Sequence, residues 1–187
     1  FGAAVEPTPR FEVLLPPLVR AAPLGAVFEW RPDAEVMKLA TRVRDQDGAA
    51  LIIDYGHMRS DAGDTFQAIA RHSFTDPLKN PGQADVTAHV DFQALSRAAE
   101  DVGARVHGPV LQGDFLKRLG IEARALTLMA KATNEVSEDI SGALKRLIAG
   151  GRGSMGTMFK VLAITEPHLT QLAGFSDDTK GAKGATA

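Results

Sequence analysis

The side chains best suited to chemistry follow directly on the apolar run of residues 49–53. Asp54, Tyr55, Gly56 and His57 come next in the chain. An aspartate at the end of a buried strand stands at the rim of the sheet, where open α/β folds bind their ligands, and a glycine there permits a sharp exit or the close approach of a ligand. Aspartate also caps turns, so the residues alone favour a ligand site and a structural turn about equally.

A second polar group lies in residues 85–92, where polar and apolar side chains alternate. In an extended segment the polar members would share one face: Asp85, Thr87, His89 and Asp91. We expect Asp91 to cap a following helix, whereas Asp85 and His89 could form a polar pair in a cleft with His72 as a third member. Hydrogen bonds that secure a long loop explain the same pattern, and the residues alone favour this structural interpretation.

The sequence gives only weak support for a metal site or a dinucleotide-binding site. Imidazole and carboxylate groups suit zinc or iron, but the candidates are spread over a long loop and the sequence has no H-E-x-x-H motif, so we expect no metal site. Gly151, Gly153 and Gly156 match G-x-G-x-x-G. Here a helix is expected before the glycines and a strand after them, which is the reverse of a dinucleotide site and predicts a plain turn.

The composition limits the class of protein. The chain has 187 residues, of which 44% are hydrophobic and 24% charged, and this predicts one globular core with a tail. The formal net charge of -2 gives no reason to expect a nucleic-acid partner. Charged residues interrupt every long apolar run, so we expect no membrane span. The absence of cysteine removes thiolate catalysis and Cys-based metal centres.

Two helix–glycine–strand units position the candidate residues. The first helix is expected to begin after Asp33 and to end before Gly48. Its apolar face is formed by Val36, Leu39, Ala40 and Val43. In the second unit a helix follows Asp91, ends at Gly103 and leads into a short strand at 104–106. Two such units, and a first strand that is apolar on both faces, predict an α/β fold with a doubly wound parallel sheet.

The rest of the chain is less regular. Residues 1–32 hold six of the ten prolines and are expected to be mostly extended or loop, with short strands at 11–15 and 26–30. Residues 56–90 form an unusually long connection that could hold a short helix after Asp64. Long connections at the carboxyl ends of strands are where α/β folds place their ligands, so the working surface is expected here.

After Pro109 the apolar spacing becomes helical. Three helices are expected in an insertion at about 113–149, the third of them capped by Ser137. A last strand follows at 158–164, and residues 166–187 are expected to be a flexible tail.

Four runs together resemble one family. They are LIIDYGH at residues 51–57, TFQAIARHSFTDPLKNPGQADVTAHVDF at 65–92, QGDFLKRLGI at 112–121 and MGTMFKVL at 155–162. These runs resemble the carboxyl-terminal half of the MidA-like family, class I S-adenosylmethionine-dependent methyltransferases linked to the assembly of respiratory complex I. The resemblance covers most of residues 26–165.

The resemblance implies a fold and an activity. The fold would be the carboxyl-terminal half of a Rossmann-like class I methyltransferase sheet, with a helical insertion before its last strand. The fifth, sixth and seventh strands of that sheet would be residues 49–53, 104–110 and 158–164. The activity would be methylation of arginine on a protein substrate, a subunit of respiratory complex I, with S-adenosylmethionine as the cofactor.

The resemblance also implies a part that is missing. In this family the first strand and its glycine-rich cofactor loop lie in the amino-terminal half, and nothing before Asp54 resembles them. The chain therefore looks like a fragment, an α/β half-domain at 33–165 with a lead-in at 1–32, which is not expected to catalyse methylation alone. A bacterial member would be cytoplasmic, and a eukaryotic one would lie in the mitochondrial matrix.

The chemistry that the resemblance implies gives the candidate residues their roles. Methyl transfer needs in-line placement of the acceptor nitrogen, and carboxylates orient a planar guanidinium through paired hydrogen bonds. Asp54 and Asp85 would orient the acceptor, Tyr55 would shape its channel, and His72 or His89 would take up the released proton or brace the loop. The residues expected to contact the substrate are Gly56, His57 and Thr87.

Two other classes of function stay open on the sequence. One is a metal-dependent hydrolase built on the His and Asp residues of the long loop. The other is a non-catalytic docking module, in which the helices after Pro109 present an apolar face to another protein. The sequence carries no signal for the oligomeric state.

Overall fold

The computed structural model of the chain describes residues 20–30, 33–80 and 82–175. The strand expected at 11–15 and the end of the tail therefore lie outside the described residues. Residues 26–30, expected to be a strand, form none, so this prediction is wrong. Their backbone instead meets a loop that lies far along the chain, where the Gly63 N–H donates to the Val27 carbonyl at 2.8 Å.

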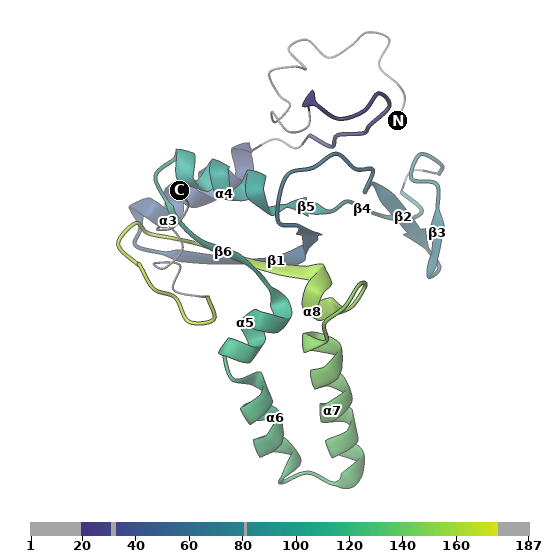
Figure 1. The fold of residues 1–187 in the computed structure, drawn as a ribbon, viewed down its shortest axis with the longest axis vertical. Coiled ribbons are helices and arrows are strands. Elements are labelled where there is room, and N and C mark those ends of the chain that lie inside the picture. Colours follow the sequence, from purple (N-terminus) through teal and green to yellow (C-terminus); the bar gives the residue numbers. More distant parts are fainter. Residues whose placement is uncertain (1–19, 31–32, 81, 176–187) are drawn as a thin grey trace, which may run out of the picture.

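A four-stranded sheet forms the centre of the fold (Figure 1). Its strands, in the order in which they pair, are β5 (Val90–Asp91), β1 (Ala49–His57), β7 (Phe159–Thr165) and β6 (Arg105–Leu111). β5 runs parallel to β1, whereas β7 lies antiparallel between β1 and β6. The three long strands lie where the family resemblance places strands five, six and seven. The sheet is thus mixed, and not wholly parallel as the two repeated units predicted.

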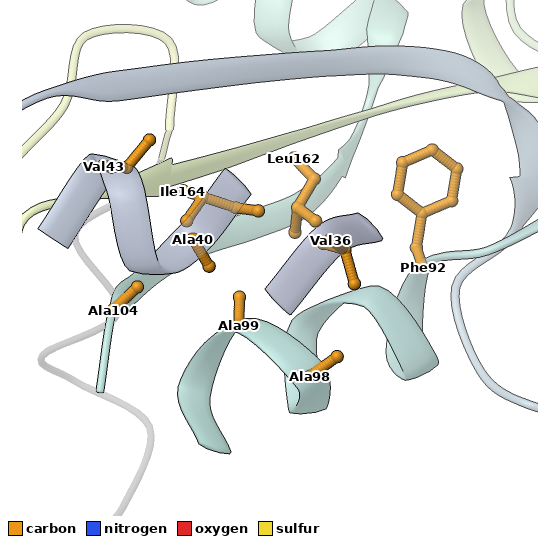
Figure 2. Packing of buried hydrophobic residues seen from close by; sticks show 9 residues of the cluster. All are labelled: Val36, Ala40, Val43, Phe92, Ala98, Ala99, Ala104, Leu162 and Ile164. Atoms are coloured by element: carbon orange, nitrogen blue, oxygen red, sulfur yellow. The ribbon is translucent and has the colours of Figure 1, made fainter. Parts of the chain in front are cut away.

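Two helices cover one face of this sheet. They are α3 (Ala34–Asp45) and α4 (Phe92–Asp101). Apolar side chains from both helices interdigitate with those of β7 in one buried cluster (Figure 2). Its members are Val36, Ala40, Val43, Phe92, Ala98, Ala99, Ala104, Leu162 and Ile164. Burial of this cluster is the main favourable term that holds the sheet and the helices together.

The expected helix boundaries agree with the structure except in detail. Asp33 occupies the N-cap position of α3, but its side chain makes no capping hydrogen bond. At the other end the helix stops before Gly48, as expected, and Asp47, with φ 51°, takes the left-handed conformation in the turn that follows. Asp91 does cap α4, because its side chain accepts a hydrogen bond from the Ala94 N–H.

The opposite face of β1 is not covered by the described residues. Leu51 and Ile53 are 51% and 47% exposed, although the residues opposite them on β7, Ala163 and Val161, are buried. The prediction that the apolar strand would be covered on both faces is therefore wrong within this chain. No helix in the described part of the chain is long and apolar enough to cross a membrane.

A second sheet of three antiparallel strands occupies the long connection. Its strands are β3 (Ser73–Thr75), β2 (Gln67–Ala70) and β4 (Asp85–Thr87), paired in that order. The helix expected after Asp64 is therefore wrong. Arg71 and His72, with φ of 50° and 62°, form the tight turn between β2 and β3, and a two-residue hairpin loop requires such positive angles.

A helical arm connects β6 to β7 and extends away from the sheet on the side opposite α3 and α4 (Figure 1). Its helices are α5 (Gln112–Arg118), α6 (Ile121–Met129), α7 (Asn134–Ile148) and the single turn α8 (Met155–Met158). The insertion predicted from the sequence is thus confirmed. Its third helix begins earlier than expected, because Thr133, and not Ser137, accepts the capping hydrogen bond from Val136.

Candidate functional site

The candidate site lies at the carboxyl end of β1, where successive residues point to opposite faces. The Asp54 carboxylate accepts a hydrogen bond from the Tyr55 N–H at 2.8 Å. Asp54 pairs in register with Lys160 of β7, so their side chains share one face of the sheet. The Lys160 ammonium donates to the carbonyls of Thr157 and Met158 at 2.9 Å each, and burial lowers the pKa of Lys160.

Tyr55 stands on the other face between two rings. Its ring meets Phe159 edge-on with centroids 5.7 Å apart, and it meets His89 in the same way at 5.6 Å. Edge-to-face pairs of this kind fix the orientation of an aromatic side chain. Tyr55 therefore forms a rigid wall at the end of β1 and holds His89 close to the strand.

The last two residues of β1 pair with β5. Gly56 lies opposite Val90, and a Cβ atom on Gly56 would come within 2.1 Å of the Val90 carbonyl oxygen, so only glycine permits this approach. His57 lies opposite Asp91, with 3.7 Å between His57 Nε2 and Asp91 Oδ2. Asp91 Oδ1 accepts from the Ala94 N–H at 3.0 Å. The capping aspartate of α4 thus also faces the candidate site.

Three segments that are distant in sequence meet beside His57 through one threonine. The Thr65 N–H donates to Glu29 Oε1 at 2.9 Å, and the Thr65 hydroxyl donates to Glu29 Oε2. The same hydroxyl oxygen accepts from the His89 N–H at 2.9 Å. Thr65 therefore fixes the Glu29 carboxylate against the loop before β2 and ties both to the segment between β4 and β5.

These segments enclose a cavity of about 200 Å³. It is lined by Phe28, Glu29, His57, Asp61, Ala62, Gly63, Thr65 and Asp91. Among the described residues that line it are three carboxylates and one imidazole, and no lysine or arginine. In the described part of the chain, no group of three or more His, Asp or Glu side chains is arranged to hold a metal ion.

The structure brings only some of the predicted site residues together. Tyr55 contacts His89, and His57 faces Asp91 in the cavity. Asp85 and His72 belong instead to the three-stranded sheet, Asp85 in β4 and His72 in the β2–β3 turn, and both side chains are exposed. Thr87 Oγ1 is buried and finds no hydrogen-bond partner among the described residues.

Three residues of the site were not predicted from the sequence, namely Glu29, Asp61 and Thr65. The local signal for Glu29 is slight, a single carboxylate between two aromatic residues in a proline-rich stretch. The glycine motif forms the predicted turn, but the single helical turn α8, and not a strand, follows it directly. The Gly151 carbonyl accepts hydrogen bonds from the Ser154 N–H and hydroxyl, which makes a turn between α7 and α8.

Comparisons with known proteins identify the family of the chain. A family model described as "Putative S-adenosyl-L-methionine-dependent methyltransferase" matches residues 2–110. The chain belongs to this methyltransferase family, as the sequence resemblance implied.

Two curated relatives are similar to most of the described chain. The "Protein arginine methyltransferase NDUFAF7 homolog, mitochondrial" of Drosophila melanogaster is 44% identical over 152 residues, covering 77% of this chain and 34% of that protein. The corresponding protein of Xenopus tropicalis is 36% identical over 151 residues, covering 75% and 33%. The chain thus spans about a third of the length of these curated relatives.

The fold has a counterpart in solved structures. A Burkholderia thailandensis protein bound to S-adenosyl-homocysteine superimposes with a TM-score of 0.61 at 28% identity, covering 76% of this chain and 37% of the other. A native crystal structure from the same organism gives a TM-score of 0.60 at 30% identity, with 72% and 37% covered. The α/β half-sheet described above is therefore part of a methyltransferase-like fold.

Proposed function

We propose that this chain is the acceptor-side part of an enzyme that methylates arginine on a protein. The observation that carries the proposal is the family match, joined to a carboxylate-lined cavity at the carboxyl end of β1. The enzyme would have about the length of the relatives. S-adenosylmethionine would supply the methyl group, and the acceptor nitrogen that gains it would give up one proton.

The described residues fit the acceptor better than the cofactor. Pockets for ligands of cofactor size enclose about 300–1,000 Å³, and the cavity beside His57 has about 200 Å³. The cofactor would therefore be held mainly by parts of the full-length polypeptide that this chain does not span. The residues of this chain would bind and orient the acceptor, exclude water and take up a proton.

The roles proposed for individual residues follow from their positions. Asp54, three residues before the end of β1, and Asp85 on exposed β4 would orient the acceptor and the chain that carries it, and Tyr55 would form the wall of the channel. His89, held by Tyr55 and Thr65, would brace the loop or take up the proton, with exposed His72 as the alternative. Gly56, His57 and Thr87 would contact the substrate.

The names of the relatives support a proposal for the partner and the compartment. Their names make them protein arginine methyltransferases of mitochondria. A protein substrate is therefore proposed here too, and more finely a subunit of respiratory complex I. The corresponding compartment would be the mitochondrial matrix in a eukaryote and the cytoplasm in a bacterium.

The test is methyl transfer by the full-length polypeptide that contains this chain. With radiolabelled S-adenosylmethionine and a respiratory membrane extract as acceptor, Asp54→Asn and Asp85→Asn are each expected to depress labelling of arginine strongly. Asp76→Asn, on an exposed turn of the same small sheet, is the control and should label normally. Unchanged turnover in both variants would refute the two orienting roles, and the absence of labelled arginine in the parent protein would refute the function.

A further inference from the structure

The cavity beside His57 is assembled from segments far apart in the sequence. They are the stretch before α3, the end of β1, the loop before β2 and the start of α4. It opens at the carboxyl ends of the parallel strands β1 and β5, the edge at which open α/β sheets bind their ligands. Because the segments are distant in sequence, the cavity is formed by the tertiary fold and not by any local pattern.

The charge of the cavity favours a cation. Among the described lining residues, Glu29, Asp61 and Asp91 supply carboxylates, and none is a lysine or an arginine. Of the three, only Asp91 is buried, whereas Glu29 is half-buried and Asp61 is exposed. Three carboxylates around one hollow attract a cationic guest and repel an anionic one.

The second carboxylate oxygen of Asp91 can accept a hydrogen bond from a cationic guest. The residue is only 9% exposed, and one of its carboxylate oxygens is used to cap α4. The other, Oδ2, lies 3.7 Å from His57 Nε2, which is longer than a hydrogen bond. This largely buried oxygen lies beside the cavity and can accept a hydrogen bond from a ligand.

The size and wall of the cavity favour a side chain over a whole cofactor. About 200 Å³ is the space of roughly six or seven waters at about 30 Å³ each. Phe28 contributes an aromatic ring to the lining. A guanidinium is planar, stacks on aromatic rings and binds carboxylates through paired hydrogen bonds, whereas an ammonium lacks this shape.

Thr65 fixes the Glu29 carboxylate beside the cavity. Both of its carboxylate oxygens accept hydrogen bonds from Thr65, which is itself fixed by the His89 N–H. These contacts fix the orientation of the Glu29 carboxylate beside the cavity. A group that is fixed before the ligand arrives loses little freedom on binding.

We propose that this cavity binds the guanidinium group of the acceptor arginine, with Glu29 and Asp91 as its main carboxylates and Asp61 at the entrance. The inference rests on the proposed methylation and goes beyond it. It assigns the contact with the guanidinium to residues outside the group expected from the sequence, and it leaves Asp85 to the outer part of the substrate.

The test measures binding to the full-length polypeptide saturated with S-adenosyl-homocysteine. The probes for calorimetry are N-acetyl-arginine amide and N-acetyl-citrulline amide, which has a neutral urea in place of the guanidinium. The arginine probe should bind at least about tenfold more tightly, as expected when a charge-assisted hydrogen bond is lost. Glu29→Gln should weaken the arginine probe about tenfold and leave the affinity for S-adenosyl-homocysteine unchanged.

The matched control is Glu35→Gln. Glu35 lies six residues further on, is exposed and pairs with Lys38, so the change should alter affinity less than about twofold. If Glu29→Gln does not fold, Asp61→Asn replaces it, because Asp61 is exposed and its carboxylate accepts from the adjacent Ala62 N–H. The Asp61→Asn change should weaken the arginine probe about threefold.

Three results would overturn the assignment. They are equal affinity for the two probes, no binding of the arginine probe at millimolar concentration, and a less than twofold effect of the cavity variant. Failure of the proposed function is a separate outcome. If arginine binding depends on Glu29 but the protein methylates nothing, the proposed function is wrong and the assignment of the cavity stands. If methylation is insensitive to Glu29→Gln, the assignment of the cavity is wrong and the proposed function stands.

Discussion

The face of the sheet under α3 and α4 and the cavity at the end of β1 are built by different means. Under the helices, apolar side chains spaced along regular elements bury one another. Around the cavity, loops are joined by side-chain hydrogen bonds, such as the one from the Thr65 N–H to Glu29. The first region is stabilised by apolar burial, which has no directional requirement, whereas the second depends on individual hydrogen bonds.

This difference suits the two regions to different tasks. A packed face fixes the strands and therefore the direction in which β1 ends. A hydrogen-bonded cluster of loops can place several polar groups around one hollow, as preorganised sites require. Changes in the packed face should therefore act mainly on stability, whereas changes around the cavity should act mainly on binding and turnover.

The largest expected effect is on stability, from Phe92→Ala. Phe92 is fully buried at the start of α4, and its truncation should lower the free energy of unfolding by about 3–5 kcal/mol because it leaves a void that the packed cluster cannot fill. Denaturant unfolding of the full-length polypeptide measures this. Phe74→Ala, on 77% exposed Phe74 of β3, should change stability by less than about 0.5 kcal/mol. A loss below about 1 kcal/mol for Phe92→Ala would contradict the packing described for this face.

Gly56→Ala should damage both regions at once. The new methyl group would meet the backbone of Val90, so β5 must move away from β1, at a cost of about 2–3 kcal/mol. Because Asp91 follows Val90, affinity for the arginine probe should fall together with stability. Thermal unfolding and calorimetry on the same sample measure the two losses.

The control for Gly56→Ala is Gly63→Ala. Gly63 lines the cavity, but a Cβ atom there has its nearest neighbour at 4.0 Å. Stability should therefore be close to that of the parent. If Gly56→Ala also retained full stability, the close parallel pairing of β1 with β5 would be disproved.

The contrast between the two regions also explains what the sequence predicted. The apolar spacing of α3, the glycine that ends α4 and the apolar run that begins β1 are local patterns, and each predicted its element, although one face of β1 is exposed. Local pattern failed where pairing is not local. Phe66, Ile69 and Ala70 fit a helical spacing, but β2 is set by hydrogen bonds with β3 and β4 on its two sides.

Only part of the candidate site could be predicted from the sequence. The sequence pointed to the end of β1, and Tyr55, His57 and His89 do lie there. Glu29 was missed because its contact with Thr65 joins residues 36 positions apart in two loops. No periodicity encodes such a contact, and only the folded chain brings the two residues together.

Thr65→Val should separate binding from stability. The change removes the hydroxyl that donates to Glu29 and accepts from the His89 N–H, and should cost about 1–2 kcal/mol of stability. Methylation should fall as well, by about tenfold, because the Glu29 carboxylate loses its fixed orientation. Thr65→Ser keeps the hydroxyl and should restore most of the rate. Equal rates for the Val and Ser variants would show that this hydroxyl does not position Glu29.

The smallest expected effect distinguishes the two tasks of a single residue. Asp91 caps α4 and faces the cavity, and asparagine caps helices about as well as aspartate. Asp91→Ala should therefore cost about 1 kcal/mol of stability, whereas Asp91→Asn should cost less than about 0.5 kcal/mol. Both changes remove the carboxylate charge, so both should weaken the arginine probe to a similar extent. If Asp91→Asn kept the parent's affinity, the carboxylate would serve the helix alone, and the cavity would take its selectivity for a cation from Glu29 and Asp61.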